Sequence, residues 1–356
     1  MYIIDKLVIK PTLKCFHNCK YCNPRQKFYD TISSQNDNST YTGNISIEKI
    51  KSAVTEAHDA GMSECLISGG DPLLYPSLLE LISHISGFKD IFIYMNSTGS
   101  NVNSSKVLQI LSSGLKAWNF SIDTINETKY DNIRGLNGAF KSTLKALNVL
   151  LDIRTKHKKH SDLYINIMTV LSRFNYTELP EIFDFSIKNN ISSVYLMNVY
   201  GDQKQKQFLL SSDQINYFKT RIVPMCIDVF KSHQLNKIII DNAHDILSSF
   251  YSCDSNSLEN YGNGIFWKDD SIKEKCNTPE HYALIEADGR VLPCCVSEIY
   301  KNDNMGNIYD NSFENIWNGL KFNQFRKNKM KFCKYCPVHQ NKTIGLVLDM
   351  CKQFGV

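Results

Sequence analysis

Short apolar runs alternate with segments of helical periodicity over the first two thirds of the chain. Six apolar runs predict buried β-strands, at residues 7–11, 64–68, 91–95, 117–122, 163–170 and 193–199. Apolar residues at helical spacing lie between them, most clearly at Phe140, Leu144, Leu147, Leu150 and Leu151 and at Leu179, Ile182, Phe183 and Ile187. This alternation predicts parallel strands joined by right-handed helical crossovers.

The number and order of these elements predict an α/β fold. Six strand–helix units fall short of a closed eight-unit barrel, so we expect a partial (β/α)6 TIM-like barrel over residues 1–235, with its site at the carboxyl ends of the strands. After residue 235 the pattern changes, and the runs 281–286 and 290–293 flank Asp288-Gly289, a dipeptide typical of a hairpin turn. We expect residues 236–356 to form a second, small α+β domain.

Composition and charge narrow the classes of function. The 356 residues include 40 Lys and Arg against 36 Asp and Glu, and the net charge of +4 is too small to indicate a nucleic-acid or membrane surface. Asp5 and Lys6 interrupt the N-terminus where a secretory signal needs an apolar run. We therefore expect a cytoplasmic protein with no nucleic-acid or membrane partner. In that reducing compartment its 12 cysteines are expected to be metal ligands or catalytic groups.

Three of the cysteines directly follow the first predicted strand. Cys15, Cys19 and Cys22 have the spacing CxxxCxxC. Three thiolates on one short loop can hold three corners of a cubane iron–sulfur cluster and leave the fourth iron without a protein ligand. The alternative is a zinc site, which normally recruits a fourth Cys or His. His17 could supply that ligand, although it lies inside the triad.

The triad, with the aromatic Tyr21 before its last cysteine, resembles the signature of the radical S-adenosylmethionine (SAM) superfamily. A turn after the second predicted strand is similar to the family's GGEP motif, whose backbone meets the methionyl amine of SAM. This turn consists of Gly69, Gly70, Asp71 and Pro72, with Asp71 in place of the commoner Glu. Taken alone, it is also consistent with an ordinary turn from strand to helix.

Four further positions match the superfamily in the expected order. Asn96 follows the third strand, where the family often has Thr-Asn-Gly. The resemblance implies that Ser121 touches the ribose of SAM and that Arg134 pairs with its carboxylate, a task suited to the planar guanidinium fork. Leu196 lies where the family packs an apolar side chain against adenine. Ser121 and Leu196 also have simpler interpretations, as a buried hydroxyl and as a core residue.

A second cysteine set lies in the last third of the chain. Cys276, Gly289 and Cys294, followed by Cys333 and Cys336, give the pattern CX12GX4C and a later CX2C. This pattern resembles the SPASM auxiliary-cluster domain in its shortened, one-cluster form called twitch, and residues 305–308, 313–317 and 326 match its linking segment. The resemblance implies one closed 4Fe–4S cluster on the four thiolates. A structural zinc site is the alternative.

Several other residues are candidates for roles in catalysis. Cys295 adjoins a predicted cluster ligand, and in radical peptide epimerases of similar layout a cysteine at this place returns a hydrogen atom to the substrate radical. The alternative is a structural role. Asp123, Asp241 and Asp288 are candidates for a substrate base, with turn or capping roles as the alternative.

The resemblance implies two cofactors, SAM and a pair of 4Fe–4S clusters, one SAM-binding and one auxiliary. It also implies reductive cleavage of SAM to a 5′-deoxyadenosyl radical that takes a hydrogen atom from the substrate, with a reductant such as flavodoxin or ferredoxin. The protein's task would be orientation and exclusion of water.

The expected substrate is a ribosomally made peptide or protein that becomes oxidised, cross-linked or epimerised. Only fourteen residues precede Cys15, so a separate leader-peptide-binding protein, or recognition without a leader, is expected. One alternative is a radical dehydrogenase or epimerase of a small molecule, such as an aminocyclitol or a sugar. Another is a non-catalytic iron–sulfur protein for electron transfer or redox sensing, which the three-cysteine triad disfavours because electron carriers close their clusters with four ligands.

Overall fold

The computed structural model describes residues 2–22, 43–199, 203–250, 276–295, 297, 304–332 and 344–347. The chain divides into two compact units. The first contains Met1–Asn119, Arg134–Leu163 and Cys276–Phe332, and the second contains Phe120–Ile133, Tyr164–Lys275 and Cys333–Val356. The strand β4 (Ala117–Ser121) passes from the first unit into the second.

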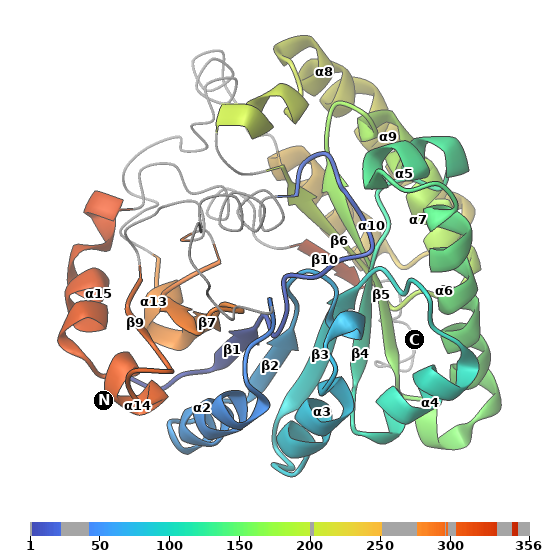
Figure 1. The fold of residues 1–356 in the computed structure, drawn as a ribbon. Helices are drawn as coiled ribbons and strands as arrows, with labels where there is room; N and C mark the ends of the chain where they lie inside the picture. Colours follow the sequence, from blue (N-terminus) through green and yellow to red (C-terminus); the bar gives the residue numbers. More distant parts are fainter. Residues whose placement is uncertain are drawn as a thin grey trace. The chain divides into compact units, whose positions relative to one another are not determined.

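A sheet with a parallel centre forms the first unit (Figure 1). Its parallel strands are β1 (Lys6–Ile9), β2 (Glu64–Ile67) and β3 (Phe92–Ser97). Helices α2 (Ile47–Asp59), α3 (Leu78–Ser86) and α4 (Ser104–Ser112) follow these strands in turn and lie on one face of them, and α6 (Ala139–Lys156) packs on α4. Residues Ile50, Ala53, Val54 and Ala57 of α2 are buried at helical spacing, which explains why this segment folds against the sheet.

The C-terminal part of the chain adds three strands to the same unit. These strands are β7 (Tyr282–Ile285), β8 (Arg290–Leu292) and β9 (Gly306–Asn307), accompanied by the helices α13 (Thr278–His281), α14 (Phe313–Trp317) and α15 (Leu320–Phe332). Strands β7 and β8 form the predicted antiparallel hairpin. Gly289 adopts a left-handed φ of 85° at its turn, and β7 pairs in parallel with β1, with Lys6 opposite Tyr282. The hairpin is therefore seated directly beside the first strand.

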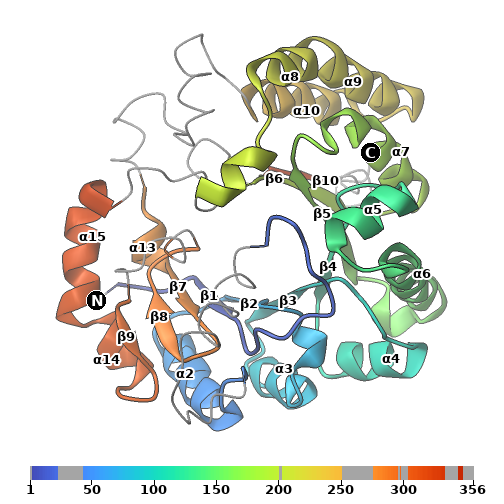
Figure 2. The same cartoon turned by 45° about the horizontal axis from the view of Figure 1, so that its top comes forward.

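The second unit is built on the parallel pair β5 (Tyr164–Leu171) and β6 (Ser193–Asn198), with β10 (Ile344–Val347) antiparallel on the other side of β6 (Figure 2). Its helices are α5 (Glu127–Arg134, the last residue of which belongs to the first unit), α7 (Leu179–Lys188), α8 (Ser212–Tyr217), α9 (Val223–Ser232) and α10 (Lys237–Phe250). Helix α7 packs on β6 and on α9, and α10 packs on α9 and on β10. Between α8 and α9, residues Phe218–Ile222 form a π-helical turn.

These elements confirm the alternation of strands and helices predicted over the first two thirds of the chain. Each of the six predicted strands is present within two residues of its expected ends. The pairing of β7 with β1 was not predicted, and it brings residues 276–332 into one compact unit with residues 1–119. The division at residue 235 stays a prediction. No helix in the described ranges has the length and apolar character to cross a membrane.

Candidate functional site

The triad cysteines lie on the cysteine loop, residues 12–22, which follows β1. All three thiols are half-buried. Thr12 opens the loop: its Oγ1 accepts a hydrogen bond from the Lys14 amide (3.1 Å) and donates to the Gly43 carbonyl (3.1 Å). At the other end, the Cys22 amide donates to the Cys19 carbonyl at 3.2 Å. The chain therefore holds the three thiols by backbone contacts at both ends of one short segment.

The donor set of the triad fits an iron–sulfur cluster. Burial raises the pKa of the Cys15 thiol to about 12, although a hydrogen bond from the His17 amide to Cys15 Sγ (3.4 Å) acts to lower this pKa. Such a thiol stays protonated at neutral pH unless a bound cation offsets the burial. In the described part of the chain, no three Cys, His, Asp or Glu side chains close around a single ion. The three thiols on one loop match the three protein ligands of a cubane that has one open iron.

The predicted SAM-binding turn packs directly on the cysteine loop. The Gly70 amide donates to the Thr12 carbonyl at 2.8 Å, and the Asp71 amide donates to the Lys14 carbonyl at 2.7 Å. A Cβ on Gly70 would stand 2.2 Å from the Lys14 carbonyl oxygen, and one on Gly69 would stand 2.5 Å from that of Thr12. Glycine is required here because the two backbones touch.

The Asp71 side chain is fully buried and hydrogen-bonded within the chain. Its Oδ1 accepts from Ser97 Oγ (2.7 Å) and the Leu73 amide (3.1 Å), and its Oδ2 accepts from Thr98 Oγ1 (2.6 Å) and the Thr98 amide (3.2 Å). Burial raises the pKa of the carboxyl, opposed by these hydrogen bonds. The carboxylate therefore ties the turn to the end of β3, and the backbone of the turn is what a ligand would meet.

Arg134 lies at the same loop. The Asn18 amide donates to its carbonyl at 2.7 Å, and its Nη1 is 3.4 Å from Cys19 Sγ. Its neighbour Gly135 has a φ of 61°, and a Cβ there would stand 2.5 Å from the Asn18 carbonyl oxygen. The structure thus brings together the triad, the 69–72 turn and Arg134, as the motifs predicted.

The remaining predicted SAM contacts are distributed between the two units. In the first unit Tyr21 is buried, and Asn96 Oδ1 accepts from Asn119 Nδ2 at 2.8 Å. In the second unit the Ser121 carbonyl accepts from Tyr130 Oη at 2.9 Å, and Leu196 is buried on β6. Of these four residues, Tyr21 lies in the cysteine loop itself, directly before Cys22.

Two of the candidate base residues have structural contacts that favour the alternative stated for them. Asp123 is fully buried, and its Oδ1 accepts from the Val170 amide at 2.8 Å, which links β4 to β5. Asp288 accepts from the Arg290 amide (3.2 Å) and from Arg290 Nε (2.7 Å) in the hairpin turn.

The second cysteine set is described in part. Cys276 is buried before α13, and Cys294 and Cys295 are half-buried after β8. Cys294 Sγ lies 3.1 Å from the hydroxyl of the buried Ser297. Cys333 and Cys336 lie outside the described residues. The glycine of the CX12GX4C pattern is explained by contact as well as by its φ, because a Cβ on Gly289 would stand 2.5 Å from Asn307 Oδ1.

The matched linking segment holds the start of this set in place. Arg326 is 3% exposed and lies over the ring of Trp317 at 4.0 Å. Its Nη1 donates to the Trp317 carbonyl (2.8 Å), and its Nε donates to the carbonyl of Pro279, three residues after Cys276 (2.9 Å). Burial lowers the pKa of the guanidinium to about 10. Arg326 therefore anchors the segment that presents Cys276.

The sequence analysis missed a buried ion pair that joins the two cysteine-bearing segments. Lys10 follows β1 and Glu286 follows β7, and their side chains meet at 3.3 Å with exposures of 6% and 7%. Lys10 lies five residues before Cys15, and Glu286 lies eight residues before Cys294. Opposite charges this far apart in sequence give no local signal, so the pair depends on the β1–β7 pairing.

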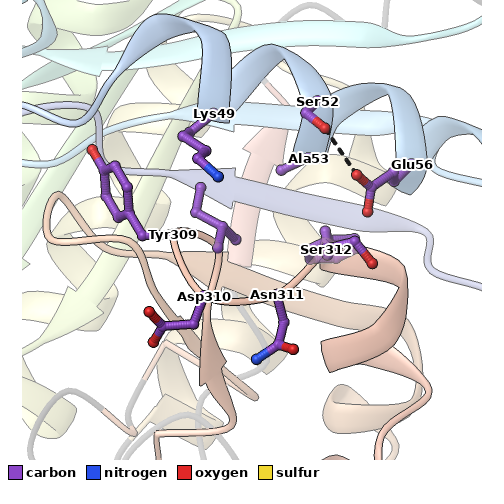
Figure 3. Close-up of a pocket in the computed structure, with 10 residues that line it drawn as sticks. Lys49, Ser52, Ala53, Glu56, Tyr309, Asp310, Asn311 and Ser312 are labelled. Carbon is purple, nitrogen blue, oxygen red and sulfur yellow. Dashed lines mark hydrogen bonds between the residues drawn. The ribbon is translucent and has the colours of Figure 1, made fainter.

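A pocket in the first unit lies between α2 and residues 308–313 (Figure 3). Lys49, Ser52 and Glu56 border it from the helix, and Tyr309 and Asp310 from the facing segment. None of the cysteines or predicted SAM contacts lines it. This pocket is therefore separate from the predicted chemistry.

Comparison with known families agrees with the geometry of the cysteine loop. Residues 9–186, half of the chain, match the model of the radical SAM superfamily, and this span includes the triad, the 69–72 turn and Arg134. The chain belongs to the radical SAM superfamily. Residues 276–337 of this radical SAM protein match the SPASM iron–sulfur cluster-binding domain. The two domains imply SAM and two iron–sulfur clusters as cofactors, as predicted.

Curated relatives of this radical SAM protein differ in their reactions. It is 24% identical over 220 residues to the GTP 3′,8-cyclase of Clostridium perfringens, with 61% of this chain and 62% of the relative covered. It is 21% identical to the AdoMet-dependent heme synthase of Methanosarcina barkeri (92% and 87% covered) and 22% identical to the PqqA peptide cyclase of Gluconobacter oxydans (90% and 78% covered). The chain thus spans less than two thirds of the first relative.

Solved structures confirm the fold of this radical SAM protein. Streptococcus suis SuiB, bound to its precursor peptide SuiA, superposes with a TM-score of 0.62 at 15% identity, covering 99% of this chain and 74% of SuiB. Native anSMEcpe with bound AdoMet and Cp18Cys peptide gives a TM-score of 0.61 at 18% identity, covering 96% and 88%. The predicted fold class, a partial α/β barrel with a small C-terminal domain, is confirmed.

Proposed function

We propose that this radical SAM protein is an enzyme that removes a hydrogen atom from a ribosomally made peptide or protein and so oxidises, cross-links or epimerises it. When bound, the triad's cluster and SAM supply a 5′-deoxyadenosyl radical by one-electron reductive cleavage, the electron coming from a donor such as flavodoxin or ferredoxin. The observation that carries the proposal is the direct packing of the cysteine loop on the 69–72 turn, with Arg134 beside Cys19.

The roles of the chain's own residues follow from their contacts. Cys15, Cys19 and Cys22 would hold the SAM-binding cluster, because the loop presents all three thiols half-buried. The backbone of residues 69–72 would orient the methionyl amine, since the Asp71 carboxylate is already hydrogen-bonded inside the chain. The buried guanidinium of Arg134 would pair with the SAM carboxylate.

The other predicted ligands complete this assignment. Tyr21, Asn96, Ser121 and Leu196 would line the remainder of the SAM site. The auxiliary cluster would be held by Cys276, Cys294, Cys333 and Cys336. Within this proposal, residues 1–235 form the radical SAM barrel and residues 236–356 the SPASM domain, and a separate protein would bind any leader peptide.

The comparisons support a peptide substrate more than another class. SuiB is described with a precursor peptide, anSMEcpe with a peptide, and the Gluconobacter relative as a peptide cyclase. SuiB and anSMEcpe cover 99% and 96% of this chain.

A small-molecule substrate is the second candidate. The GTP cyclase and heme synthase relatives carry names of reactions on small molecules. An aminocyclitol or a sugar would be oxidised or epimerised by the same hydrogen abstraction. Mass spectrometry after incubation with candidate peptides and small molecules encoded or made near the gene would separate the two classes.

The first test is cofactor assembly. Anaerobic reconstitution should give brown protein with about eight irons per chain, because two cubanes form. Replacing Cys15, Cys19 and Cys22 together by Ala should leave about four irons and abolish release of 5′-deoxyadenosine from SAM. Iron analysis and chromatography of the products make the measurement.

A matched control for this variant is available in the second unit. Cys226 is buried in α9 and belongs to neither cysteine set, so Cys226→Ala should keep the full iron content and SAM cleavage. Formation of 5′-deoxyadenosine by the triad variant would refute the assignment of the triad. Colourless protein that binds only zinc would refute the proposed function.

A further inference from the structure

The side chain of His17 reaches from the cysteine loop to the end of β3. His17 is 1% exposed, and its Nε2 lies 2.8 Å from Ser100 Oγ. The Ser100 and Thr98 hydroxyl oxygens lie 3.1 Å apart, and Thr98 Oγ1 lies 2.6 Å from Asp71 Oδ2. Ser100, Thr98 and Asp71 are all less than 10% exposed. A continuous buried chain of polar contacts thus runs from the middle of the triad to the SAM-binding turn.

Thr98 lies at the centre of this chain of contacts. Its Oγ1 is within donating distance of both Asp71 Oδ2 (2.6 Å) and Ser100 Oγ (3.1 Å), and it accepts from the Ser100 amide at 3.3 Å. Ser100 Oγ in turn lies 2.8 Å from His17 Nε2, where the tautomer of the ring sets which atom donates. Neighbouring hydrogen bonds in such a buried chain strengthen one another.

We propose that the His17 relay (His17, Ser100, Thr98 and Asp71) fixes the cysteine loop against the SAM-binding turn, with His17 and Ser100 as positioning residues for the cluster and SAM. The backbone bonds at Thr12, Lys14 and Asn18 hold the loop on either side of His17. The relay adds a side-chain contact at His17, between Cys15 and Cys19. The residues between these two cysteines set the distance between their thiols. This role rests on the proposed function only where SAM is concerned.

The relay should matter because its members are buried. When one partner is removed, no water is present to replace the lost hydrogen bond of the others. The closed position of the cysteine loop is then less stable by about the net contribution of one hydrogen bond. That loss, about 1 kcal/mol, corresponds to an about fivefold change in an opening equilibrium. Replacing two adjacent partners by apolar groups should cost less than replacing either alone.

The first experiment measures the loop in the full chain without metal. Hydrogen–deuterium exchange of peptides covering residues 12–22 should be about fivefold faster in Ser100→Ala and in His17→Leu. His17→Gln, whose side-chain amide can still form a hydrogen bond with Ser100, should exchange at close to the unaltered rate. The matched control is Ser193→Ala, at the first residue of β6 in the second unit. It removes a hydrogen bond from a similarly buried serine, Ser193 Oγ to Asn166 Oδ1 at 2.7 Å. This control should leave the loop unchanged.

The second experiment measures SAM affinity of the reconstituted protein. Ser100→Ala and His17→Leu should weaken SAM binding about fivefold, and His17→Gln should restore it. Unchanged exchange and unchanged affinity in both variants would overturn the relay. A loss of SAM affinity in Ser193→Ala as large as in Ser100→Ala would also overturn the relay, since the effect would then be one of general stability. If the unaltered protein fails to bind SAM, the proposed function fails, and the exchange experiment still decides the relay.

Discussion

Gly70 is a position where no side chain fits. Its missing Cβ leaves room for the Lys14 carbonyl, so the distance between the cysteine loop and the SAM-binding turn is set by two backbones in contact. The neighbouring Asp71 has one methylene fewer than the Glu usual in the superfamily, and the four hydrogen bonds of its carboxylate end within residues 73–98. Here a motif expected to bind a ligand also holds two strand ends together.

Gly70→Ala should displace the cysteine loop and cost the protein its SAM-binding cluster. A methyl group 2.2 Å from the Lys14 oxygen cannot be accommodated unless backbone moves. Iron analysis should fall from about eight to about four per chain, with the auxiliary cluster kept. The control is Gly138→Ala, where φ is 77° but a Cβ would meet nothing within 4 Å. It should cost about 1 kcal/mol of stability and no iron, and equal iron loss in both would contradict the steric argument.

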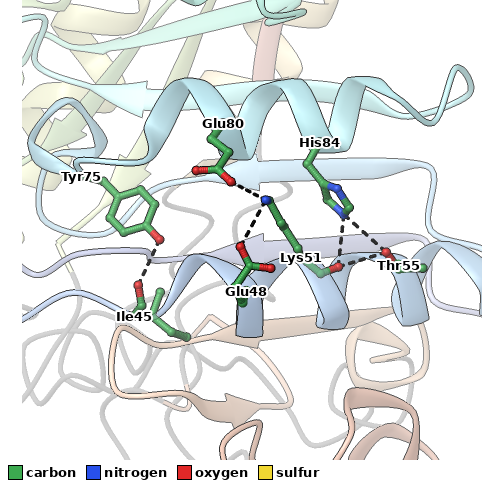
Figure 4. Close-up of polar contacts among 7 residues, drawn as sticks. All are labelled: Ile45, Glu48, Lys51, Thr55, Tyr75, Glu80 and His84. Carbon is green, nitrogen blue, oxygen red and sulfur yellow. Dashed lines mark hydrogen bonds and ion pairs between the residues drawn. The ribbon is translucent and has the colours of Figure 1, made fainter.

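Strand β1 is the element that links the two cysteine sets. It pairs with β2 on one side and with β7 on the other, and Lys10 and Glu286 meet where β1 and β7 end. Helix α2, which follows β1 in the described chain, is fastened to α3 by Lys51 between Glu48 and Glu80, and by His84 Nε2, 3.2 Å from the Lys51 carbonyl (Figure 4). The contacts of Lys51 with Glu80 and with His84 join residues 29 and 33 positions apart, so sequence periodicity could not predict them.

Lys10→Met should strongly destabilise the fold because it leaves the Glu286 carboxylate buried without its cation. Breaking one partner of a buried pair costs about 3 kcal/mol or more, whereas the double variant Lys10→Met, Glu286→Leu should recover most of the loss. Chemical denaturation measures the free energy of unfolding of the single and the double variant. Lys6→Met is the control on the same strand: its pair with Glu64, 3.7 Å, is half-exposed and should cost less than about 1 kcal/mol. An additive double variant would contradict the pairing.

Asp184 fastens α7 to α9 in the second unit. Lys188 Nζ (2.7 Å) and His233 Nε2 (2.8 Å) contact its carboxylate, and their hydrogen bonds hold its pKa below the usual range. Because a depressed pKa contributes stability above the unfolded pKa, Asp184→Asn should cost about 0.5 kcal/mol at pH 7. The difference should vanish as the pH falls below about 4 and through the lowered pKa. Urea denaturation of the unaltered protein and of Asp184→Asn, at pH 7 and at a pH below the lowered pKa, measures this difference in the free energy of unfolding. An equal cost in acid would contradict the predicted direction of the pH dependence.

At the scale of the whole molecule, the outcome of the proposed reaction would depend on which group meets the substrate radical. Cys295 is half-buried beside Cys294, whose thiol contacts Ser297. If Cys295 donates a hydrogen atom, Cys295→Ala should keep SAM cleavage but lose at least 90% of the epimerised product, and the unaltered enzyme should transfer one solvent deuterium to it. Cys65→Ala, buried in β2, is the control. Unchanged turnover in Cys295→Ala, with a product two hydrogens lighter, would exclude Cys295 and assign an oxidation.

The sequence by itself determined the six strands, the hairpin and the membership of the triad, because hydrophobic period and cysteine spacing are local properties of the chain. Its resemblance to the radical SAM superfamily also predicted that the 69–72 turn and Arg134 serve the same site as the triad. Only the tertiary structure decided that β7 lies beside β1, that Lys10 meets Glu286 and that His17 reaches Ser100. Those contacts join segments 83 to 276 residues apart. No local pattern records which distant segment comes to lie alongside, and it is this proximity that supplies each buried polar group with the partner that offsets its desolvation.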